Sequence, residues 1–177
     1  TDAQKAKVFT KIGKEIAIAV KAAGPDPTVN SKLKDLIAKA KAANVPNDNI
    51  DRIIKKASSN DGEDYETIYY EGYGPQGIAI IVEATTDNRN RTAGDVRHTF
   101  DKYGGNMGAM GCVDFMFEDK GVIILLREDN EVDEDTLMEA ALEAGAADFQ
   151  ADDDVFEIYT NANDFSAVRE ELEKLGY

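Results

Sequence analysis

The chain has 177 residues, a formal net charge of −15 and 42% apolar residues. This apolar fraction is a little below the globular average and far from that of disordered chains, so a packed core is expected. No run of 18 apolar residues is present, which argues against a membrane-spanning helix. The first residues also lack the apolar stretch and cleavage site of a signal peptide, so a secretory leader is not expected.

The charge is distributed unevenly along the chain. Residues 1–56 hold 12 Lys/Arg and 6 Asp/Glu, residues 57–117 hold 4 and 10, and residues 118–177 hold 4 and 19. A basic segment within a strongly acidic protein indicates that the basic part contacts a polyanion. The acidic remainder would repel that polyanion and orient the basic face toward it.

The chain contains one cysteine, Cys112, and one histidine, His98. A single cysteine excludes an intrachain disulfide and fits a reducing, cytoplasmic location. The sequence holds no Cys/His zinc cluster and no Walker A, G-x-S-x-G or Cys–His nucleophile pattern. We therefore expect no catalytic residue, no metal site and no cofactor, although counting residues does not exclude a carboxylate-bound Mg²⁺.

Residues 2–23 form an amphipathic pattern typical of a helix. Its apolar stripe consists of Val8, Phe9, Ile12, Ile16, Ala19 and Val20. The opposite stripe carries Lys7, Lys11, Lys14 and Lys21. Because these lysines are spaced by four, three and seven residues, their ammonium groups share one face, which Ile18 interrupts.

Two further helices are expected before residue 58. The second begins at Asn30 or Ser31, either of which can cap it, and buries Leu33, Leu36, Ile37 and Ala40. The third turns Ile50, Ile53, Ile54 and Ala57 inward and Arg52, Lys55 and Lys56 outward. Because none of the three is long enough to persist alone, residues 1–57 are predicted to form a basic three-helix domain. A lysine-rich outer face that serves only solubility is the alternative to phosphate contact.

The rest of the chain alternates between strands and helices. A linker at 58–64 precedes an α/β domain at 67–118, with strands at 67–71, 78–83 and 112–117 and a helix at 92–103. The acidic domain at 119–177 has strands at 122–126, 147–150 and 155–160 and helices at 133–144 and 163–175. Its β-α-β-β-α order lacks the last strand of a ferredoxin-like unit. The predicted fold class is therefore α+β.

Glycine-rich segments occur at 72–77 and 104–111. The first matches G-x-G-x-x-G, but a strand follows it and Pro75 lacks an amide donor, so a turn is favoured over a nucleotide site. Three tyrosines near this turn either stack on bases or cover a sheet face: Tyr69, Tyr70 and Tyr73. The second segment is predicted to be a flexible connection.

Arg89 and Arg91 lie just before the helix predicted to start at Thr92 with Asp95 as its capping partner. Arginines beside the start of a helix favour phosphate binding, so Arg89 and Arg91 are predicted to form a second phosphate-binding site, the second predicted anchor, besides the lysines of residues 2–23. Arg97 would extend this site. The alternative is that both arginines bind Asp87, Glu83 or carbonyl groups at the strand end. A weaker hypothesis treats Asp95, His98 and Glu83 as the catalytic groups of a hydrolase or transferase.

Six sequence blocks together resemble the YebC/PmpR family, which includes the mitochondrial translational activator of cytochrome c oxidase. They are Lys-Ala-Lys-Ala-Ala-Asn at 39–44, Pro46 with Asp-Asn-Ile at 48–50, Tyr-Glu-Gly-Tyr-Gly-Pro-x-Gly at 70–77, Thr-Asp-Asn-Arg-Asn-Arg-Thr at 86–92, Val-Arg-His at 96–98 and Gly-Gly-Asn at 104–106. The resemblance implies a helical amino-terminal domain followed by two α/β domains, the last inserted in the second. It also implies DNA-binding transcriptional regulators or ribosome-associated translation factors that relieve stalling, with no enzyme among them.

This chain differs from the chains of that family in two respects. Family chains begin with a basic stretch containing Gly-His-Ser-Lys-Trp, which is absent here, and they continue past residue 177. Both α/β domains are therefore expected to be truncated in this chain.

Residues and resemblance together predict a non-enzymatic, cytoplasmic regulator of gene expression that binds nucleic acid. The expected partners are ribosomal RNA, tRNA or DNA, and ribosomal proteins for the acidic part. The competing prediction is an acidic protein-interaction adapter that does not bind nucleic acid. The predicted contact residues are Lys7, Lys11, Lys14, Lys21, Arg52, Lys55, Lys56, Arg89, Arg91 and Arg97.

Overall fold

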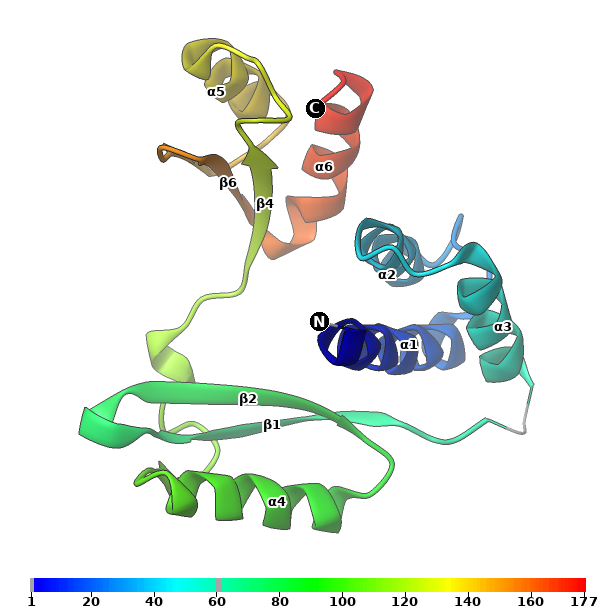
Figure 1. The fold of residues 1–177 in the computed structure, drawn as a ribbon, viewed down its shortest axis with the longest axis vertical. Helices are drawn as coiled ribbons and strands as arrows, with labels where there is room; N and C mark the ends of the chain where they lie inside the picture. The colour runs from blue at the N-terminus through cyan, green and yellow to red at the C-terminus, as the bar shows by residue number, and fades with distance from the viewer. Residues whose placement is uncertain (1, 60–61) are drawn as a thin grey trace. The chain divides into compact units, whose positions relative to one another are not determined.

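The structure, a computed structural model, describes residues 2–59 and 62–177. Within these residues it contains six α-helices and two antiparallel three-stranded sheets, which confirms the α+β class (Figure 1). The chain divides into two compact units, Thr1–Phe117 and Glu118–Tyr177. The predicted linker at 58–64 includes residues 60 and 61, which lie outside the described residues. The finer division into three domains stays a prediction.

Three amphipathic helices form the amino-terminal part of the first unit: α1 (Asp2–Ala23), α2 (Ser31–Ala42) and α3 (Asn47–Ser58). Their shared core consists of Ile12, Ile16, Ala19, Val20, Leu33, Leu36, Ala40, Val45, Ile50 and Ala57. The predicted buried stripe of α1 is thus confirmed from Ile12 onward. Val8 is 45% exposed, because the core begins only with Phe9 and Ile12 and the first turns of α1 project beyond it.

Asn30 joins α1 to α2 and confirms the predicted cap. Its side chain is buried, and its Oδ1 accepts from the amide of Leu33 at 3.1 Å. Its Nδ2 donates to the carbonyl groups of Ala19 at 2.9 Å and Gly24 at 2.8 Å. One side chain thereby satisfies both the end of α1 and the start of α2.

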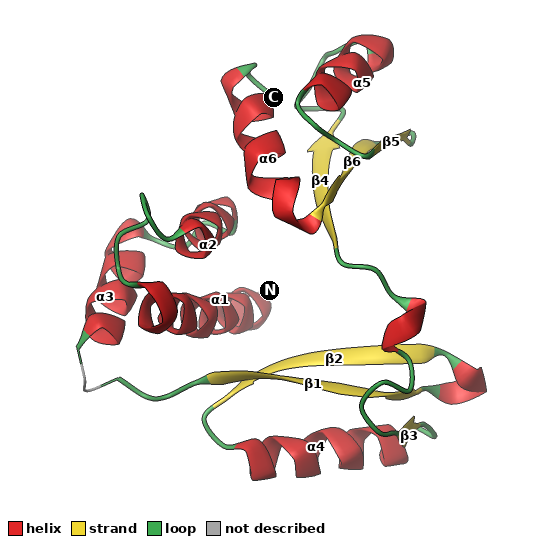
Figure 2. Cartoon of the chain, turned by 180° about the vertical axis from the view of Figure 1, so that it is seen from behind, coloured by secondary structure: helices red, strands yellow, loops and turns green. Residues whose placement is uncertain are grey.

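The rest of the first unit is a sheet of order β2-β1-β3, formed by β1 (Glu66–Tyr73), β2 (Ala79–Thr86) and β3 (Asn106–Met107). Helix α4 (Arg89–Lys102) follows β2. Directly opposed residues of an antiparallel pair project from the same face. Gly72 lies beside Phe100 of α4, so its face of the sheet packs on α4. Tyr69 and Glu83 are paired on the other face. Helix α1 contacts β2, and Figure 2 shows α1 and α4 on opposite sides of this sheet.

The structure corrects two predictions in this sheet region. Residues 112–117 do not form a strand: Asp114–Met116 is a 3₁₀ turn, with Val113 buried and Phe115 74% exposed. Helix α4 begins at Arg89 and not at Thr92, because the side chain of Asn88 accepts from the amide of Arg91 and caps the helix three residues earlier.

The second unit is a sheet of order β4-β6-β5 with two helices on one face. Its elements are β4 (Lys120–Leu126), α5 (Glu134–Glu143), β5 (Asp148–Ala151), β6 (Val155–Asn161) and α6 (Phe165–Lys174). This is the predicted β-α-β-β-α order. Its core consists of Leu125, Leu137, Ala141, Phe156, Ile158, Val168 and Leu172. Among the described residues, no helix is both long and apolar enough to cross a membrane.

Candidate nucleic-acid interface

Three of the predicted lysines line one groove. Lys7, Lys11 and Lys14 project from α1 toward Glu83 and Thr85 of β2 and enclose, with Ala6 and Thr10, a hollow of about 430 Å³. The spacing of four and three residues places the lysines on one helix face, which is the face that α1 turns toward the sheet. Glu83 is the only carboxylate among the groove-lining residues, so the groove is predominantly cationic.

A second hollow of about 250 Å³ continues this surface toward α3. It shares Thr10 and Lys14 with the groove and is also lined by Lys21, Lys56 and Tyr65. The ammonium group of Lys14 lies 5.2 Å from the centre of the Tyr65 ring, a cation–π geometry that holds the lysine at the boundary of the two hollows. Tyr65 donates its hydroxyl to Glu63, which raises the pKa of Tyr65 to about 12. The tyrosine therefore stays neutral beneath the cation.

The protein's own carboxylates neutralise only part of this surface. Lys11 lies 3.9 Å from Glu15, which also lies 3.5 Å from Lys39. In the part of the chain that the structure describes, no carboxylate oxygen lies within 4.0 Å of Lys7 or Lys14. The side chains of Lys11 and Lys39 are each 58% exposed, whereas that of Glu15 is 15% exposed, so both ammonium groups stay accessible from solvent beside a largely covered carboxylate.

Lys21 has a structural role in the first unit. Its ammonium group donates to the carbonyl groups of Gly62 at 3.2 Å and Glu63 at 3.0 Å and to the carboxylate of Asp64. This pairing lowers the pKa of Asp64. Because three acceptors already surround it, Lys21 ties α1 to the segment that leads into the sheet.

Arg52, Lys55 and Lys56 share one exposed face of α3, as their spacing of three and four residues predicts. Arg52 donates to the side chain of Asn49 one turn earlier. Only Lys56 reaches the hollows beside α1. The cationic surface therefore runs from Lys7 to Lys56, with Arg52 and Lys55 flanking it.

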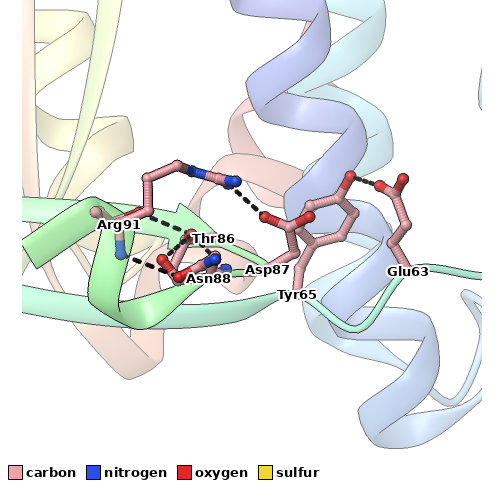
Figure 3. Close-up of polar contacts among 7 residues, drawn as sticks. Glu63, Tyr65, Thr86, Asp87, Asn88 and Arg91 are labelled. Carbon is pink, nitrogen blue, oxygen red and sulfur yellow. Dashed lines mark hydrogen bonds and ion pairs between the residues drawn. The ribbon is translucent and has the colours of Figure 1, made fainter. Parts of the chain in front are cut away.

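The second predicted anchor is engaged with carboxylates. The Arg89 guanidinium donates to both carboxylate oxygens of Glu66, at 2.7 and 3.3 Å, which lowers the pKa of Glu66. Arg91 donates to Asp87 at 2.7 Å, and Asn88 caps the helix beside it (Figure 3). Of the two alternatives left by the sequence, the geometry favours binding of both arginines within the protein.

Arg97 is separated from the lysine groove. It is exposed on α4, and α4 packs on the sheet face opposite to the one that carries Glu83. Asp95 and His98 also belong to α4, whereas Glu83 lies on the opposite face of the sheet. The three side chains suggested as catalytic groups are therefore not brought together. Among the described residues, no group of three or more His, Cys, Asp or Glu side chains is arranged to hold a metal ion.

A residue that the sequence did not single out organises the loop after β3. Glu71 is buried, and its carboxylate accepts from the amides of Gly111 at 2.6 Å, Val113 at 3.0 Å and Asp114 at 2.7 Å. These amides, with Gly111 the largest contributor, lower the pKa of Glu71. The carboxylate occupies a ready-made anion site and fixes the loop on the sheet.

The G-x-G-x-x-G segment is a turn between two strands, as expected. Pro75–Gly77 forms a short turn in which Gln76, with a φ of 61°, and Gly77, with a φ of +76°, both have a left-handed backbone conformation. At Gly72 an added Cβ would lie 2.5 Å from the carbonyl oxygen of Asn106, so this glycine allows β3 and α4 to approach the strand. The neighbouring Tyr73 donates its hydroxyl to the carbonyl of Cys112 at 3.3 Å, whereas Tyr69 is 55% exposed.

Comparisons with known proteins agree with this architecture. Residues 1–60 match the family model of the TACO1/YebC protein N-terminal domain, and residues 65–177 match the model of the TACO1/YebC second and third domain. A probable transcriptional regulatory protein of Acetivibrio thermocellus is 66% identical over 100% of this chain and 73% of its own length. A protein of the same description from Clostridioides difficile is 59% identical over 99% of this chain and 74% of its own.

A solved structure shows the same fold. The crystal structure of the conserved hypothetical protein Aq1575 from Aquifex aeolicus superposes with a TM-score of 0.87 at 49% identity and covers 99% of this chain and 72% of that one. The relatives named above carry the description of regulatory proteins and not of enzymes. With both family models matched along nearly its whole length, the chain belongs to the TACO1/YebC family.

Proposed function

We propose that this chain is a non-enzymatic regulator of gene expression that binds the phosphate backbone of a nucleic acid with the face of α1 that lines the groove. The observation that carries the proposal is the convergence of Lys7, Lys11 and Lys14 on one groove. Several lysines at adjacent positions release condensed counterions together, which is the main source of affinity in sequence-independent binding. The local charge of the first 56 residues, 12 basic against 6 acidic, supports this placement.

The physiological target has two candidates. The relatives are named probable transcriptional regulatory proteins, which supports DNA. We favour ribosomal RNA or tRNA, and a translation factor that relieves stalling, because lysine–phosphate contacts position a protein without reading base sequence. The sequence also carries no pattern typical of a module that reads base edges. The whole protein is expected to act in the cytoplasm.

The acidic adapter remains a second candidate because of one feature of β4. Its run Val-Ile-Ile-Leu-Leu at 122–126 is typical of a strand buried on both faces. The helices cover only the face of Leu125, whereas Val122, Ile124 and Leu126 are 45, 59 and 44% exposed. An apolar stripe on a unit with 19 acidic and 4 basic residues fits a basic protein surface, such as that of a ribosomal protein.

A binding comparison across salt concentrations tests the proposal. Duplex DNA, structured RNA and ribosomes are titrated with the protein, and affinity is measured at increasing ionic strength. On duplex DNA each phosphate contact contributes about −0.9 to the slope of log affinity against log salt concentration, so three lysines predict a slope of about −2.7 or steeper. Absence of binding to all three targets contradicts the proposed function, and binding to ribosomes without binding to DNA or RNA favours the adapter.

A further inference from the structure

The hollow that continues the groove toward α3 is lined mainly by apolar side chains. Phe9 and Ala17 reach it from α1, and Ile53 and Ala57 reach it from α3. Ala57 belongs to the core of the three helices, and the other three residues are partly buried and pack against that core. At this hollow the apolar core of the helices is therefore open to a ligand, and covering such a surface favours binding.

Gly13 contributes to this opening. It lines the hollow from within α1, where glycine is the least favoured residue after proline. An added Cβ would lie 3.1 Å from Cδ1 of Ile53, so a side chain at this position would press on α3. The glycine thus allows the two helices to approach one another, and no side chain from this position fills the hollow.

Four charged residues border the apolar lining: Lys14, Lys21, Lys56 and Glu63. Lys21 is already surrounded by three acceptors, and Glu63 accepts from the hydroxyl of Tyr65. Within residues 2–59 and 62–177, no carboxylate oxygen lies within 4.0 Å of Lys14 or Lys56. Two ammonium groups without a carboxylate partner therefore stand beside an apolar hollow, which fits a ligand with an apolar body and an anionic group.

A nucleotide has this composition, and the neighbouring groove favours it over an acidic peptide. The hollow shares Thr10 and Lys14 with the groove, so a strand with its phosphates on the groove lysines passes directly beside the hollow. The volume of about 250 Å³ lies just below the range of roughly 300–1,000 Å³ for drug-sized ligands, so it suits a single ring system. A base can enter only when it is unpaired, because its neighbours cover its faces inside a duplex.

We propose that the hollow between α1 and α3 accepts one unpaired nucleobase of a strand whose phosphates lie on the groove lysines. The base covers the apolar side chains of Phe9, Ala17 and Ile53, while Lys14 and Lys56 bind its flanking phosphates. This inference rests on the proposed function and deepens it, because it narrows the target from nucleic acid in general to strands with an accessible base, such as loops and ends of structured RNA.

The test uses the whole chain and two fluorescent phosphodiester strands of about ten units that carry the same charge. One strand lacks all bases, and the other has a single adenine at its centre. Ala17→Leu fills part of the hollow and removes no charge. Ala42→Leu is the matched control, since Ala42 is exposed on α2 and lines neither the groove nor the hollow. Anisotropy titrations measure affinity, and circular dichroism verifies that each variant is folded.

The unaltered protein should bind the strand with the adenine about 5- to 150-fold more tightly than the strand without bases, which corresponds to about 1–3 kcal/mol for one covered base. Ala17→Leu should abolish this preference and leave the affinity for the base-free strand unchanged, whereas Ala42→Leu should keep the preference. Equal affinity of the unaltered protein for both strands overturns the inference, and so does a preference that Ala17→Leu retains.

A third probe distinguishes a base from a protein side chain. It is an acidic peptide of about ten residues with one phenylalanine, matched in length to the strands. If this peptide binds more tightly than the adenine strand and Ala17→Leu weakens its binding, the hollow takes a protein side chain and the inference is wrong. A peptide that binds more weakly, or that Ala17→Leu does not affect, supports the nucleobase. Absence of binding to both strands and to structured RNA by the unaltered protein contradicts the proposed function itself.

Discussion

Gly72 tests whether the glycine-rich turn is a packing device. An added Cβ at this position would lie 2.5 Å from the carbonyl oxygen of Asn106, 2.9 Å from Cε1 of Phe100 and 3.0 Å from Cα of Met107. Two of these atoms belong to the backbone of β3, so the strand itself has to shift. Overpacking of this kind costs about 1–3 kcal/mol, which is the destabilisation expected for Gly72→Ala.

Gly94 provides a matched control with the opposite sign. It lies inside α4, and an added Cβ would meet nothing within 4 Å. Alanine is favoured over glycine in a helix by about 1 kcal/mol, so Gly94→Ala should stabilise the first unit. The same Gly-to-Ala change is therefore expected to lower the free energy of unfolding at Gly72 and to raise it at Gly94.

The single cysteine gives a local assay for both variants. Cys112 follows β3 in the loop that Glu71 holds, and its thiol-labelling rate reports opening of this region. Gly72→Ala should label about 5- to 150-fold faster, because about 1.4 kcal/mol corresponds to a factor of ten. Gly94→Ala should label more slowly. An unchanged labelling rate and unfolding midpoint for Gly72→Ala would refute the close approach of β1 and β3.

Two further substitutions test buried polar contacts. Asn30→Ala removes the cap of α2 and leaves two carbonyl groups without their donor, so we expect a loss of about 1–3 kcal/mol in urea unfolding of the helices; a change below experimental error would contradict the capping role. For Glu71 the folded pKa lies below the ordinary value of 4.5, so its stabilisation is present above pH 4.5 and is lost as the pH falls toward the lowered pKa. Glu71→Gln should therefore increase Cys112 labelling at neutral pH and flatten its rise in acid, whereas identical pH profiles for the two proteins would exclude the carboxylate as the anchor of the loop.

The helices could be predicted from the sequence because each carries its own periodic apolar stripe. The sequence predicts a helix at 2–23, the bounds of α1, and places the cap of the next helix at Asn30 or Ser31, of which the structure shows Asn30. Strands joined by a short turn, such as β1 and β2, could also be predicted from the sequence. These features depend on residues close together in the sequence, where spacing determines the geometry.

The loop after β3 could not be predicted because a distant carboxylate determines it. Alternation of Val113, Phe115 and Phe117 is typical of a strand, yet Glu71 accepts from the amides of Val113 and Asp114, which are then unavailable to a ladder. Glu71 lies about 40 residues earlier in the chain, and no local sequence pattern indicates its hydrogen bonds to this loop.

Only one side of the candidate groove could be predicted from the sequence. The lysine stripe of α1 follows from residue spacing, but the opposite side of the groove is formed by β2, which lies beyond the predicted linker. The carboxylate partner of Arg89, Glu66, was missed because it belongs to the start of β1, 23 residues earlier. Pairing of Arg91 with Asp87 was foreseen as an alternative because the two residues are four apart.

The most direct test of the central claim compares two triple variants that remove the same charge. One is Lys7→Gln/Lys11→Gln/Lys14→Gln in the groove, and the other is Lys32→Gln/Lys41→Gln/Lys102→Gln at exposed positions outside it. The salt dependence of RNA binding is measured for both. If the groove lysines contact phosphates, the log–log slope of the first variant falls by about 0.7 per contact on a single strand or 0.9 on a duplex, while the second keeps the slope of the unaltered protein. Equal losses in the two variants, or an unchanged slope in the first, would contradict a phosphate-binding groove.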